Sequence, residues 1–331
     1  MSKYDVYGIG NALVDIVTEV DYDFFAKNEV EKGVMTLVDE KRQHHLVKAI
    51  DMKKSKMACG GSAGNTMIAV SQFGGKSFYS FLVAKDELGK FFLDDLKRNR
   101  VETGWIYDQL PEGITGKCLV MTTPDADRTM NTFLGVSSFL SPEHLDENAI
   151  KTSHYIYLEG YLVASPKGLD AMKEAKKIAE KHNVQTSLTL SDPNMVKFFG
   201  KQFEDVIGAS VDLLFCNEEE ALMISGTTDL KIAREKLKQI AKRFAITLGA
   251  NGALIYDGDT FINIEPYAVK AVDSNGAGDM FAGAFLYGLT HGHGYADAGK
   301  LASLASSRVV SQFGPRLVAE QSKKVLEDLT A

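Results

Sequence analysis

The sequence predicts an α/β fold with a mostly parallel central sheet and a smaller β-sheet that projects from it. Three observations lead to this prediction. Short apolar runs rich in β-branched and aromatic residues alternate with helical patterns, which is typical of parallel sheets. Two further pairs of strand-like segments have no helical pattern between them. The chain has 331 residues, 45% of them hydrophobic, which is enough to bury a substantial core without disulfides or metals.

Six apolar runs are the expected strands of the central sheet. They lie at 4–10, 77–82, 153–158, 184–190, 212–216 and 244–248. Two helix starts are well marked, because Ser141-Pro142 and Ser165-Pro166 each offer a serine cap followed by proline at the first helical position. The second of these predicts a helix that runs to about His182.

The smaller sheet is expected from two pairs of segments, 16–20 with 34–38 and 117–122 with 128–133. Residues 123–127, between the second pair, have the chemistry of a hairpin turn. A projecting sheet beside a cleft can act as a lid. The expected β-lid comprises residues 16–38 and 116–138, and the expected large domain comprises residues 1–15, 39–115 and 139–331.

Composition excludes several classes of protein. A formal net charge of −7 argues against a nucleic-acid partner, which requires a concentrated basic surface. The three cysteines, Cys59, Cys118 and Cys216, are too few and too irregularly spaced for a disulfide framework, so free thiols in a reducing compartment are expected. No signal-peptide pattern and no apolar run of about 20 residues is present, so we expect a cytoplasmic protein without a membrane partner.

The segment 271–286 is the most informative for chemistry. A loop of small residues leads directly into a helical pattern, so the backbone N–H groups of Gly276, Ala277 and Gly278 can converge on an anion. Asp279, in the first turn, could accept a proton from an attacking hydroxyl, although the helix dipole alone would also favour a carboxylate there. Two glycines beside such a carboxylate match the requirements of phosphoryl transfer.

Two other nucleotide-binding motifs are incomplete. Gly75-Lys76-Ser77 is similar to the end of a P-loop, but Val70 stands where that pattern requires glycine. Gly8-Ile9-Gly10 is similar to the start of a dinucleotide fingerprint, but Leu13 stands where the third glycine is required. A P-loop enzyme and a dehydrogenase are therefore not expected.

Two loops provide candidates for binding a small polar substrate. Asp15 lies in an otherwise apolar run after the first strand and could bind two vicinal hydroxyls of a sugar, or be a simple loop aspartate. The glycine-rich loop 59–65 ends in Asn65, whose amide has both a donor and an acceptor for a ribose hydroxyl. An apolar wall against a base, or a plain contact of lid with core, is expected from Met130, Thr132, Leu134 and Tyr161.

A possible metal site follows the strand that ends near Cys216. Asn217 is followed by three glutamates, which could simply complement a helix dipole. Glu220, three residues after Asn217, could also organise Mg²⁺ and its waters, because Mg²⁺ takes few direct protein ligands. His291 and His293 are similar to a metal pair but fall in a glycine-rich loop, so loop histidines are the preferred interpretation.

Taken together, these motifs resemble those of the ribokinase-like (PfkB) family of carbohydrate and nucleoside kinases. The resemblance runs along almost the whole chain and is carried by Gly10–Asp15, Gly60–Asn65, Asn217–Glu220 and Asp273–Asp279. It implies a three-layer α/β sandwich with a β-lid, and ATP-dependent phosphorylation of the 5′-hydroxyl of a ribose-bearing substrate. Adenosine is the expected substrate, and another nucleoside, ribose or fructose are the alternatives.

The resemblance also implies roles for individual residues. Asp279 would be the general base, and Gly276, Ala277 and Gly278 would form the anion hole. Arg128, on the lid, would approach the phosphates when the lid closes. The substrate site would include Asn11, Asp15, Gly60, Gly61, Ser62 and Asn65. The site for ATP and Mg²⁺ would include Asn217, Glu220, Thr247, Gly249, Gly252 and Asn275.

Some alternatives remain open from the sequence. The segment Ser191–Asn194 matches the sugar-kinase branch of the family, which keeps a free sugar among the expected substrates. A K⁺ requirement and either a monomer or a homodimer are compatible with the motifs. A nucleoside-binding sensor without turnover is an alternative of a different class, but such a sensor would have no need of Asp279 or of both cradle glycines.

Overall fold

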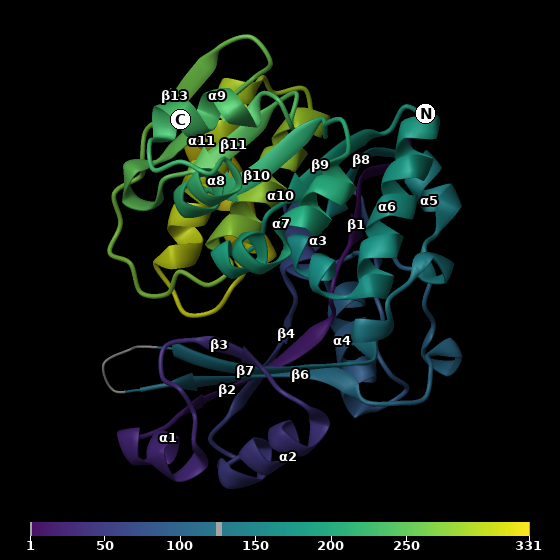
Figure 1. Ribbon diagram of the computed structural model, residues 1–331, viewed down its shortest axis with the longest axis vertical. Coiled ribbons are helices and arrows are strands. Elements are labelled where there is room, and N and C mark those ends of the chain that lie inside the picture. Colours follow the sequence, from purple (N-terminus) through teal and green to yellow (C-terminus); the bar gives the residue numbers. More distant parts are fainter. Residues whose placement is uncertain (1, 124–127, 331) are drawn as a thin grey trace.

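The computed structural model describes residues 2–123 and 128–330, so four of the five residues of the predicted turn at 123–127 lie outside the described residues. In the described part, the chain forms one eight-stranded sheet and one five-stranded sheet. Figure 1 shows the smaller sheet below the larger one, with helices α1 and α2 beneath it. The α/β fold with a large mostly parallel sheet and a second small sheet is therefore confirmed.

The large sheet has the strand order β13-β12-β11-β10-β9-β8-β1-β5, and its first six strands in chain order are parallel. Those six correspond to the six predicted apolar runs: β1 Tyr4–Ile9, β5 Ser77–Ser80, β8 Ser153–Leu158, β9 Gln185–Thr189, β10 Leu213–Asn217 and β11 Phe244–Thr247. Two antiparallel strands that were not predicted, β12 Ala253–Tyr256 and β13 Phe261–Ile264, extend one edge.

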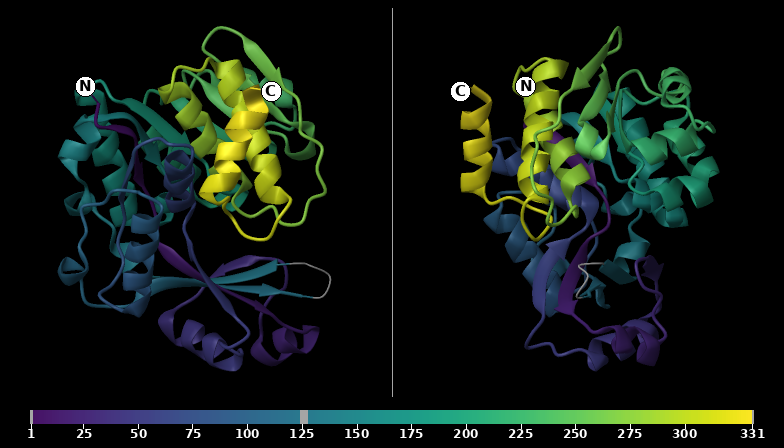
Figure 2. Two further views of the ribbon diagram at one scale, coloured as in Figure 1. Left: turned by 180° about the vertical axis from the view of Figure 1, so that it is seen from behind. Right: turned by 90° about the vertical axis from the view of Figure 1, so that its left-hand side faces the viewer.

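Helices cover both faces of the large sheet, and a separate buried apolar cluster fills each interface. Figure 2 shows the layers edge-on in its right-hand view. One face carries α3 Ser62–Gln72, α4 Glu87–Arg98, α10 Ala277–Thr290, α11 Tyr295–Val310 and α12 Ala319–Thr330. The other carries α5 Glu147–Lys151, α6 Pro166–Lys181, α7 Pro193–Ile207, α8 Glu218–Ile224 and α9 Leu230–Leu237.

The two predicted helix starts have different outcomes. Ser165 caps α6, which ends before His182 as predicted. Ser141 begins only a single 3₁₀ turn, because the chain becomes extended at Leu145 and Asp146 then caps a new helix, α5. The 3₁₀ helices are η1 Tyr107–Gln109, η2 Val136–Phe139, η3 Pro142–His144, η4 Gly160–Ala164 and η5 Gly249–Asn251.

The small sheet has the order β3-β7-β6-β2-β4. Its strands are β2 Leu13–Glu19, β3 Met35–Leu37, β4 Lys56–Gly60, β6 Thr115–Thr122 and β7 Arg128–Gly135. The predicted pairing of 117–122 with 128–133 is confirmed, because β6 and β7 are antiparallel neighbours. The sheet is flanked by α1 Tyr22–Asn28 and α2 Glu40–Ala49.

The predicted pairing of 16–20 with 34–38 is wrong. Strand β2 pairs with β4 and β6, whereas β3 pairs with β7 at the opposite edge. Helix α1, capped by Asp21, lies between β2 and β3, so no tight turn joins the two strands. Strand β4 and helix α2 fall within the range 39–115, so more of the chain builds this sheet than the two ranges expected for the lid.

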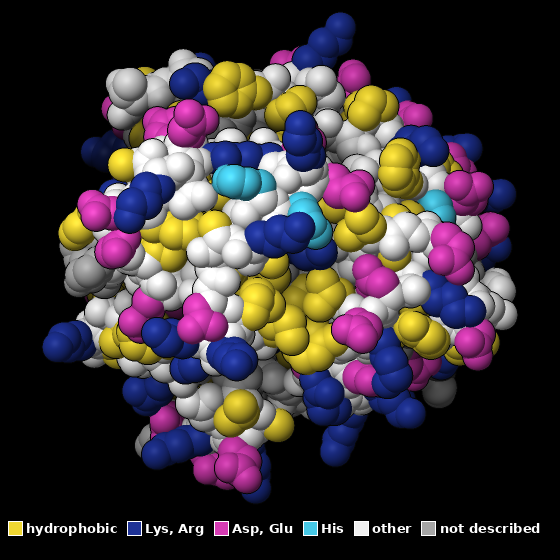
Figure 3. Space-filling model, turned by 90° about the horizontal axis from the view of Figure 1, so that it is seen from below, with side chains coloured by type: hydrophobic (Ala, Val, Ile, Leu, Met, Phe, Trp, Pro, Cys, Tyr) yellow, Lys and Arg dark blue, Asp and Glu magenta, His cyan; other side chains and the backbone are white. Residues whose placement is uncertain are grey.

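The surface on the side of the small sheet carries charges of both signs. Figure 3 shows this face from below, with acidic and basic side chains interspersed around a group of hydrophobic side chains. Among the described residues, no helix is both long and apolar enough to span a bilayer.

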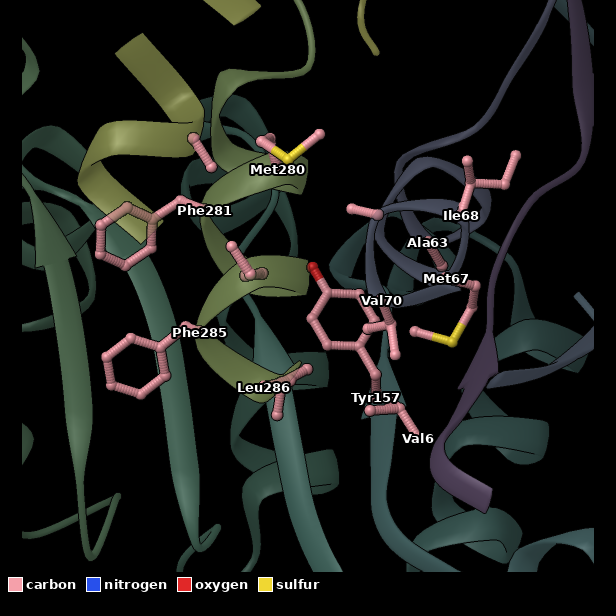
Figure 4. Close-up of a cluster of buried hydrophobic side chains, with 14 of the residues drawn as sticks. Val6, Ala63, Met67, Ile68, Val70, Tyr157, Met280, Phe281, Phe285 and Leu286 are labelled. Atoms are coloured by element: carbon pink, nitrogen blue, oxygen red, sulfur yellow. The ribbon is translucent and has the colours of Figure 1, made fainter. Parts of the chain in front are cut away.

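Close packing of α10 against α3 determines where the functional loops meet. A Cβ atom on Gly283 would lie 2.6 Å from Ala69 Cβ and 2.8 Å from Thr66 O, so glycine allows the two helices to approach. Figure 4 shows Tyr157 of β8 within this cluster, together with Met67 of α3 and Phe285 of α10. The N-terminal ends of α3 and α10 are thereby held side by side.

Candidate active site

A cavity of about 420 Å³ lies between the two sheets. Its floor comes from loops after strands of the large sheet and from the N-terminal ends of α3 and α10, and its roof comes from one face of the small sheet. Ligands of open α/β sheets bind at the carboxyl ends of the strands, where these loops gather. The predicted residues that line it are Asn11, Asp15, Gly61, Ser62, Asn65, Met130, Thr132, Leu134, Tyr161, Asn217, Glu220, Thr247, Asn275, Gly276, Gly278 and Asp279.

The loop before α10 is shaped by the residues predicted to bind phosphate. Gly276 has a φ of +74°, and a Cβ atom there would lie 2.3 Å from Pro315 O, so only glycine fits. The buried Asp273 carboxylate holds the loop by accepting from Asn275 N at 2.8 Å and from Gly314 N at 2.9 Å. The start of α10 is therefore firmly connected to the segment that follows α11.

Gly278 is open to the cavity. Apart from its chain neighbours and the backbone of its own helix, no described atom lies within 4 Å of a Cβ atom built on it, so packing within the protein does not demand glycine there. Ala277 differs from its two neighbours, since it is not among the residues that line the cavity and its N–H donates to Ser274 O at 3.3 Å. Gly276 and Gly278 are thus the members of the predicted cradle that reach the cavity.

Asp279 lies in the first turn of α10 and faces the start of α3. Ser62 Oγ donates to Asp279 Oδ1 at 2.6 Å, and Asn65 Nδ2 donates to Oδ2 at 2.8 Å. Burial raises the pKa of Asp279 to about 6, despite these two hydrogen bonds and the nearby Arg316 charge, which favour the ionised form. The carboxylate is therefore a base that is ionised at neutral pH but close to its pKa.

The Gly60–Gly61 loop leaves room for the groups around it. A Cβ atom on Gly60 would lie 2.4 Å from Asp15 Oδ1, and one on Gly61 would lie 2.2 Å from Asn11 O. Gly61, with a φ of +92°, and Ser62 line the cavity, whereas Gly60 lies just behind it and makes space for the Asp15 carboxylate. The structure thus brings the two predicted sugar-binding loops together.

Sequence reasoning missed Glu159 as an ionisable group of the cavity. This buried carboxylate follows β8 and accepts from the backbone N–H of Asn11 at 3.1 Å and of Ala63 at 2.7 Å. Burial raises its pKa to about 7. The signal in the sequence was a single charge directly after the apolar run 153–158, where the end of a parallel strand would place it in the cleft.

Apart from Asp15 near the start of β2, the roof of the cavity is mostly apolar, and it is larger than predicted. Met130, Thr132 and Leu134 of β7 line it together, as strand alternation requires. Met35 and Leu37 of β3 and Cys118 and Val120 of β6 also line the roof. The two β3 residues were missed because β3 was assigned to the wrong neighbour. Tyr161, on η4, also lines the cavity and is largely shielded from solvent.

On the side of the cavity predicted to bind the nucleotide, the Glu220 carboxylate is hydrogen-bonded to Asn217, the residue that caps its own helix. Asn217 N and Nδ2 each donate to Glu220 at 2.9 Å, and Glu220 N donates to Asn217 Oδ1 at 2.8 Å. Burial raises the pKa of Glu220 to about 7, and the nearby Asp192 charge acts in the same direction. Asp192, which also lines the cavity, was not among the predicted site residues.

Three further residues predicted for the site are not among the residues described as lining the cavity. Gly249 and Gly252 flank a turn behind the cavity and are not among its lining residues, and a Cβ atom on Gly252 would lie 2.0 Å from Ile264 O. The backbone of Arg128 begins β7 opposite Thr122, while its side chain lies outside what the structure describes. His291 packs on Tyr287 at the end of α10, in agreement with a loop histidine.

Comparison with known proteins finds similarity to kinases over nearly the whole chain. Residues 33–322 match the family model described as pfkB family carbohydrate kinase. The solved structure of adenosine kinase from Sinorhizobium meliloti is 34% identical, has a TM-score of 0.91 and covers 99% of this chain and 100% of its own. The probable sugar kinase protein from Rhizobium etli CFN 42 is also 34% identical over 99% of this chain and 100% of its own, with a TM-score of 0.90. Adenosine kinase of Saccharomyces cerevisiae is 26% identical in an alignment of 335 positions, which covers 95% of this chain and 96% of the yeast protein.

Proposed function

The chain belongs to the pfkB family of carbohydrate kinases, and from that premise we propose that it phosphorylates the 5′-hydroxyl of adenosine with ATP. The chain is a sugar or nucleoside kinase, whichever of these acceptors it uses. One observation carries the choice of a nucleoside. Polar groups suited to ribose hydroxyls line the floor and the start of β2, and the rest of the roof is mostly apolar and suited to a base.

Binding of a ribose is supported by hydrogen-bonding groups of the floor together with Asp15, which β2 of the small sheet contributes from the other side of the cavity. The Asp15 carboxylate can accept from vicinal hydroxyls, and the Asn65 and Asn11 amides can both donate and accept. All three side chains line the same cavity. A ribose held there would direct its 5′-hydroxyl toward Asp279, on the neighbouring helix.

Phosphoryl transfer would then proceed between Asp279 and the start of α10. The 5′-oxygen attacks the γ-phosphorus, the bond from that phosphorus to the β,γ-bridging oxygen breaks, and the Asp279 carboxylate takes the hydroxyl proton. The N–H groups at Gly276 and Gly278 would stabilise charge on the transferring group. We further propose that the lid residue Arg128 approaches the phosphates.

The nucleotide would occupy the part of the cavity lined by Thr247, Asn275 and the Asn217–Glu220 pair. The buried Glu220 carboxyl and the half-buried Asp192 carboxyl fit a hydrated Mg²⁺ that is bound mainly by phosphate oxygens and water. Among the described residues no cluster of three or more His, Cys, Asp or Glu is arranged as a metal site, which is compatible with such sparse protein ligation. Bound Mg²⁺ would neutralise charge on the phosphates.

A free sugar is the second candidate acceptor. The carboxyl of Glu159 lines the floor, and Ser191 and Asp192 add polar groups at one side. A small polyol would satisfy these groups without needing the apolar roof. The decisive quantity is therefore the contribution of the roof to substrate selection.

The test is a side-by-side measurement of kcat/KM for adenosine, other nucleosides, ribose and fructose, with ADP formation as the readout. We expect adenosine to have the highest value, and Tyr161→Ala to raise its KM because contact with a base is worth about 1–3 kcal/mol. A higher kcat/KM for ribose or fructose would refute the choice of adenosine. Tight nucleoside binding without ADP formation would indicate a sensor instead.

A further inference from the structure

Arg316 lies in the segment between α11 and α12 and joins three other parts of the fold. Its Nε donates to Asn65 Oδ1 on α3 at 2.7 Å, and its Nη2 donates to the carbonyl of Cys59 at the end of β4 at 2.6 Å. Its Nη1 pairs with Asp95 on α4 at 2.5 Å, and both side chains of this ion pair are only 15% exposed. No motif in the sequence pointed to this residue.

We propose that Arg316 is a positioning residue for phosphoryl transfer, which holds the Asn65 amide so that its NH₂ group faces Asp279. The inference rests on the proposed role of Asp279 as general base. A guanidinium has donors and no acceptor, so the atom of Asn65 that faces Arg316 must be the carbonyl oxygen. The NH₂ group then points the other way, toward Asp279 Oδ2, where the distance is 2.8 Å.

The orientation of this amide decides what Asp279 can do. With the NH₂ group facing it, the carboxylate receives a second hydrogen bond that complements the one from Ser62 and stays in one orientation. With the amide reversed, a carbonyl oxygen would face the carboxylate and repel its negative charge. Arg316 excludes the reversed orientation, because its Nε would then face the NH₂ group, donor against donor.

The same guanidinium holds the loop that precedes α3. Cys59 directly precedes Gly60 and Gly61, two residues whose conformation is constrained by Asp15 and Asn11. By bonding to the Cys59 carbonyl and to Asn65 together, Arg316 fixes both ends of this loop against α4. Arg316 therefore helps to set the distance between the sugar-binding loop and the base, together with the direct bond from Ser62 to Asp279.

Removal of the Arg316 charge should also affect the titration of the base. The ionisable groups that act on Asp279 or feel its charge are Arg316, Glu159, Tyr79, Tyr157 and Tyr161. Of these only Arg316 is a cation, and it favours ionised Asp279. Without it the pKa of Asp279 should rise from about 6, so more of the base would be protonated at neutral pH.

The experiment compares Arg316→Met with Arg98→Met. Arg98 pairs with the other oxygen of Asp95 at 3.1 Å, so this control removes an arginine from the same carboxylate without touching Asn65. We expect Arg316→Met to lower kcat by about 10- to 100-fold, the loss typical of a misplaced catalytic group, with a smaller change in KM for ATP. The acid limb of its kcat–pH profile should move to higher pH, and Arg98→Met should match the wild type in both.

Two further variants keep the test decisive. Arg316→Lys retains the charge but cannot reach three acceptors with one ammonium, so it should fold and show an intermediate kcat even if Arg316→Met does not fold. In the Asn65→Ala background, the Arg316 substitution should lower kcat by a smaller factor than in the wild type, because the part of its effect that passes through that amide is already lost. Equal kcat and an unshifted acid limb in Arg316→Lys, Arg316→Met and Arg98→Met would overturn the proposal.

Titration of the Asp279 carboxyl by ¹³C NMR separates this inference from the proposed function. The resonance can be assigned by its loss in Asp279→Asn. If no acceptor is phosphorylated even by the wild type, the proposed function fails. A higher pKa of Asp279 in Arg316→Met than in Arg98→Met would still support the proposed action of Arg316 on Asn65 and Asp279. An equal pKa in both variants would refute it.

Discussion

Gly276 and Gly278 stand two residues apart at the start of α10, yet they lack a side chain for different reasons. At Gly276 the backbone conformation and the Pro315 carbonyl leave no space for one. At Gly278 the space is open and belongs to the cavity. The first glycine therefore serves the fold, and the second leaves room for a ligand.

This difference yields a paired prediction. Gly276→Ala should lower the free energy of unfolding by about 1–2 kcal/mol or more, the cost of a left-handed conformation for alanine. Gly278→Ala should leave it unchanged or raise it by up to about 1 kcal/mol, because alanine favours helix. Urea denaturation measures both. In activity assays Gly278→Ala should nevertheless lower kcat/KM for ATP by roughly 10- to 100-fold through misplacement of the phosphates. Full activity of Gly278→Ala would show that no ligand approaches this position.

The proposed base gives a second prediction at the residue scale. Asp279→Asn should lower kcat by roughly 10²–10⁴-fold, the usual contribution of general-base catalysis, with little change in substrate affinity. Single-turnover rates and equilibrium binding of the acceptor measure the two effects separately. A kcat within about threefold of the wild type would remove Asp279 from the mechanism.

Residue types could be predicted from the sequence where they form a compact motif. Asp279 and Asn65 each lie near the start of a helix that follows a glycine-rich loop, a pattern that is visible in the sequence. Arg316 reaches Asn65 from 251 positions away, so no local pattern could reveal the contact. Glu159 was visible as an isolated charge after a strand, but only the fold shows that it is buried among backbone donors.

Elements of the large sheet were more predictable than those of the small one. Parallel strands buried on both faces are continuous apolar runs, so all six were recognised. Strands of the small sheet are less uniform, since β6 and β7 have eight residues each whereas β3 has only three, two of them exposed. The pairing partners of β2 and β3 depend on helix α1 and on the strand order of the whole sheet, rather than on the sequence of each strand.

The alternation of β7 leads to a prediction at the scale of one strand. Met130 lines the roof of the cavity, whereas Phe133 lies in a small hollow on the opposite face, against α2. Met130→Ala should therefore raise KM for adenosine severalfold with little effect on kcat, since an apolar contact made equally in ground and transition states is lost. Phe133→Ala should lower the melting temperature and leave KM within about twofold of the wild type. The reverse pattern would show that the other face of the strand meets the substrate.

At the scale of the whole molecule, the cavity draws on lining residues from Asn11 to Phe281 and on both sheets. The sequence predicted most of the polar residues that meet there, but not how the two sheets enclose them. One consequence is that carboxyl groups from three separate elements are withdrawn from water together. Burial raises the pKa of Glu159 and of Glu220 to about 7 and that of Asp279 to about 6.

These three carboxyl groups predict how stability depends on pH. Their pKa values in the unfolded chain are near 4, so between about pH 4 and 7 the folded state binds more protons than the unfolded state. The free energy of unfolding should therefore fall as the pH rises through this window and level off above it. Burial lowers the pKa of His144 below 6.5, which acts in the opposite direction but involves one group against three. Carboxyl groups with lowered pKa, such as Glu102 and Asp212, lose their contribution only below about pH 4.5.

Urea denaturation between pH 4.5 and 8.5 would measure this dependence in the wild type, Glu159→Gln and Glu220→Gln. Each substitution removes one group that releases a proton in the window, so each variant should show a shallower fall in the free energy of unfolding than the wild type. Each glutamine would also turn an NH₂ group toward a backbone or amide donor, which lowers stability at every pH and does not alter the slope. If both variants kept the full slope of the free energy of unfolding against pH, another titratable group would have to cause the pH dependence. A free energy of unfolding that rose from pH 5 to pH 7 would contradict the explanation by buried carboxyl groups.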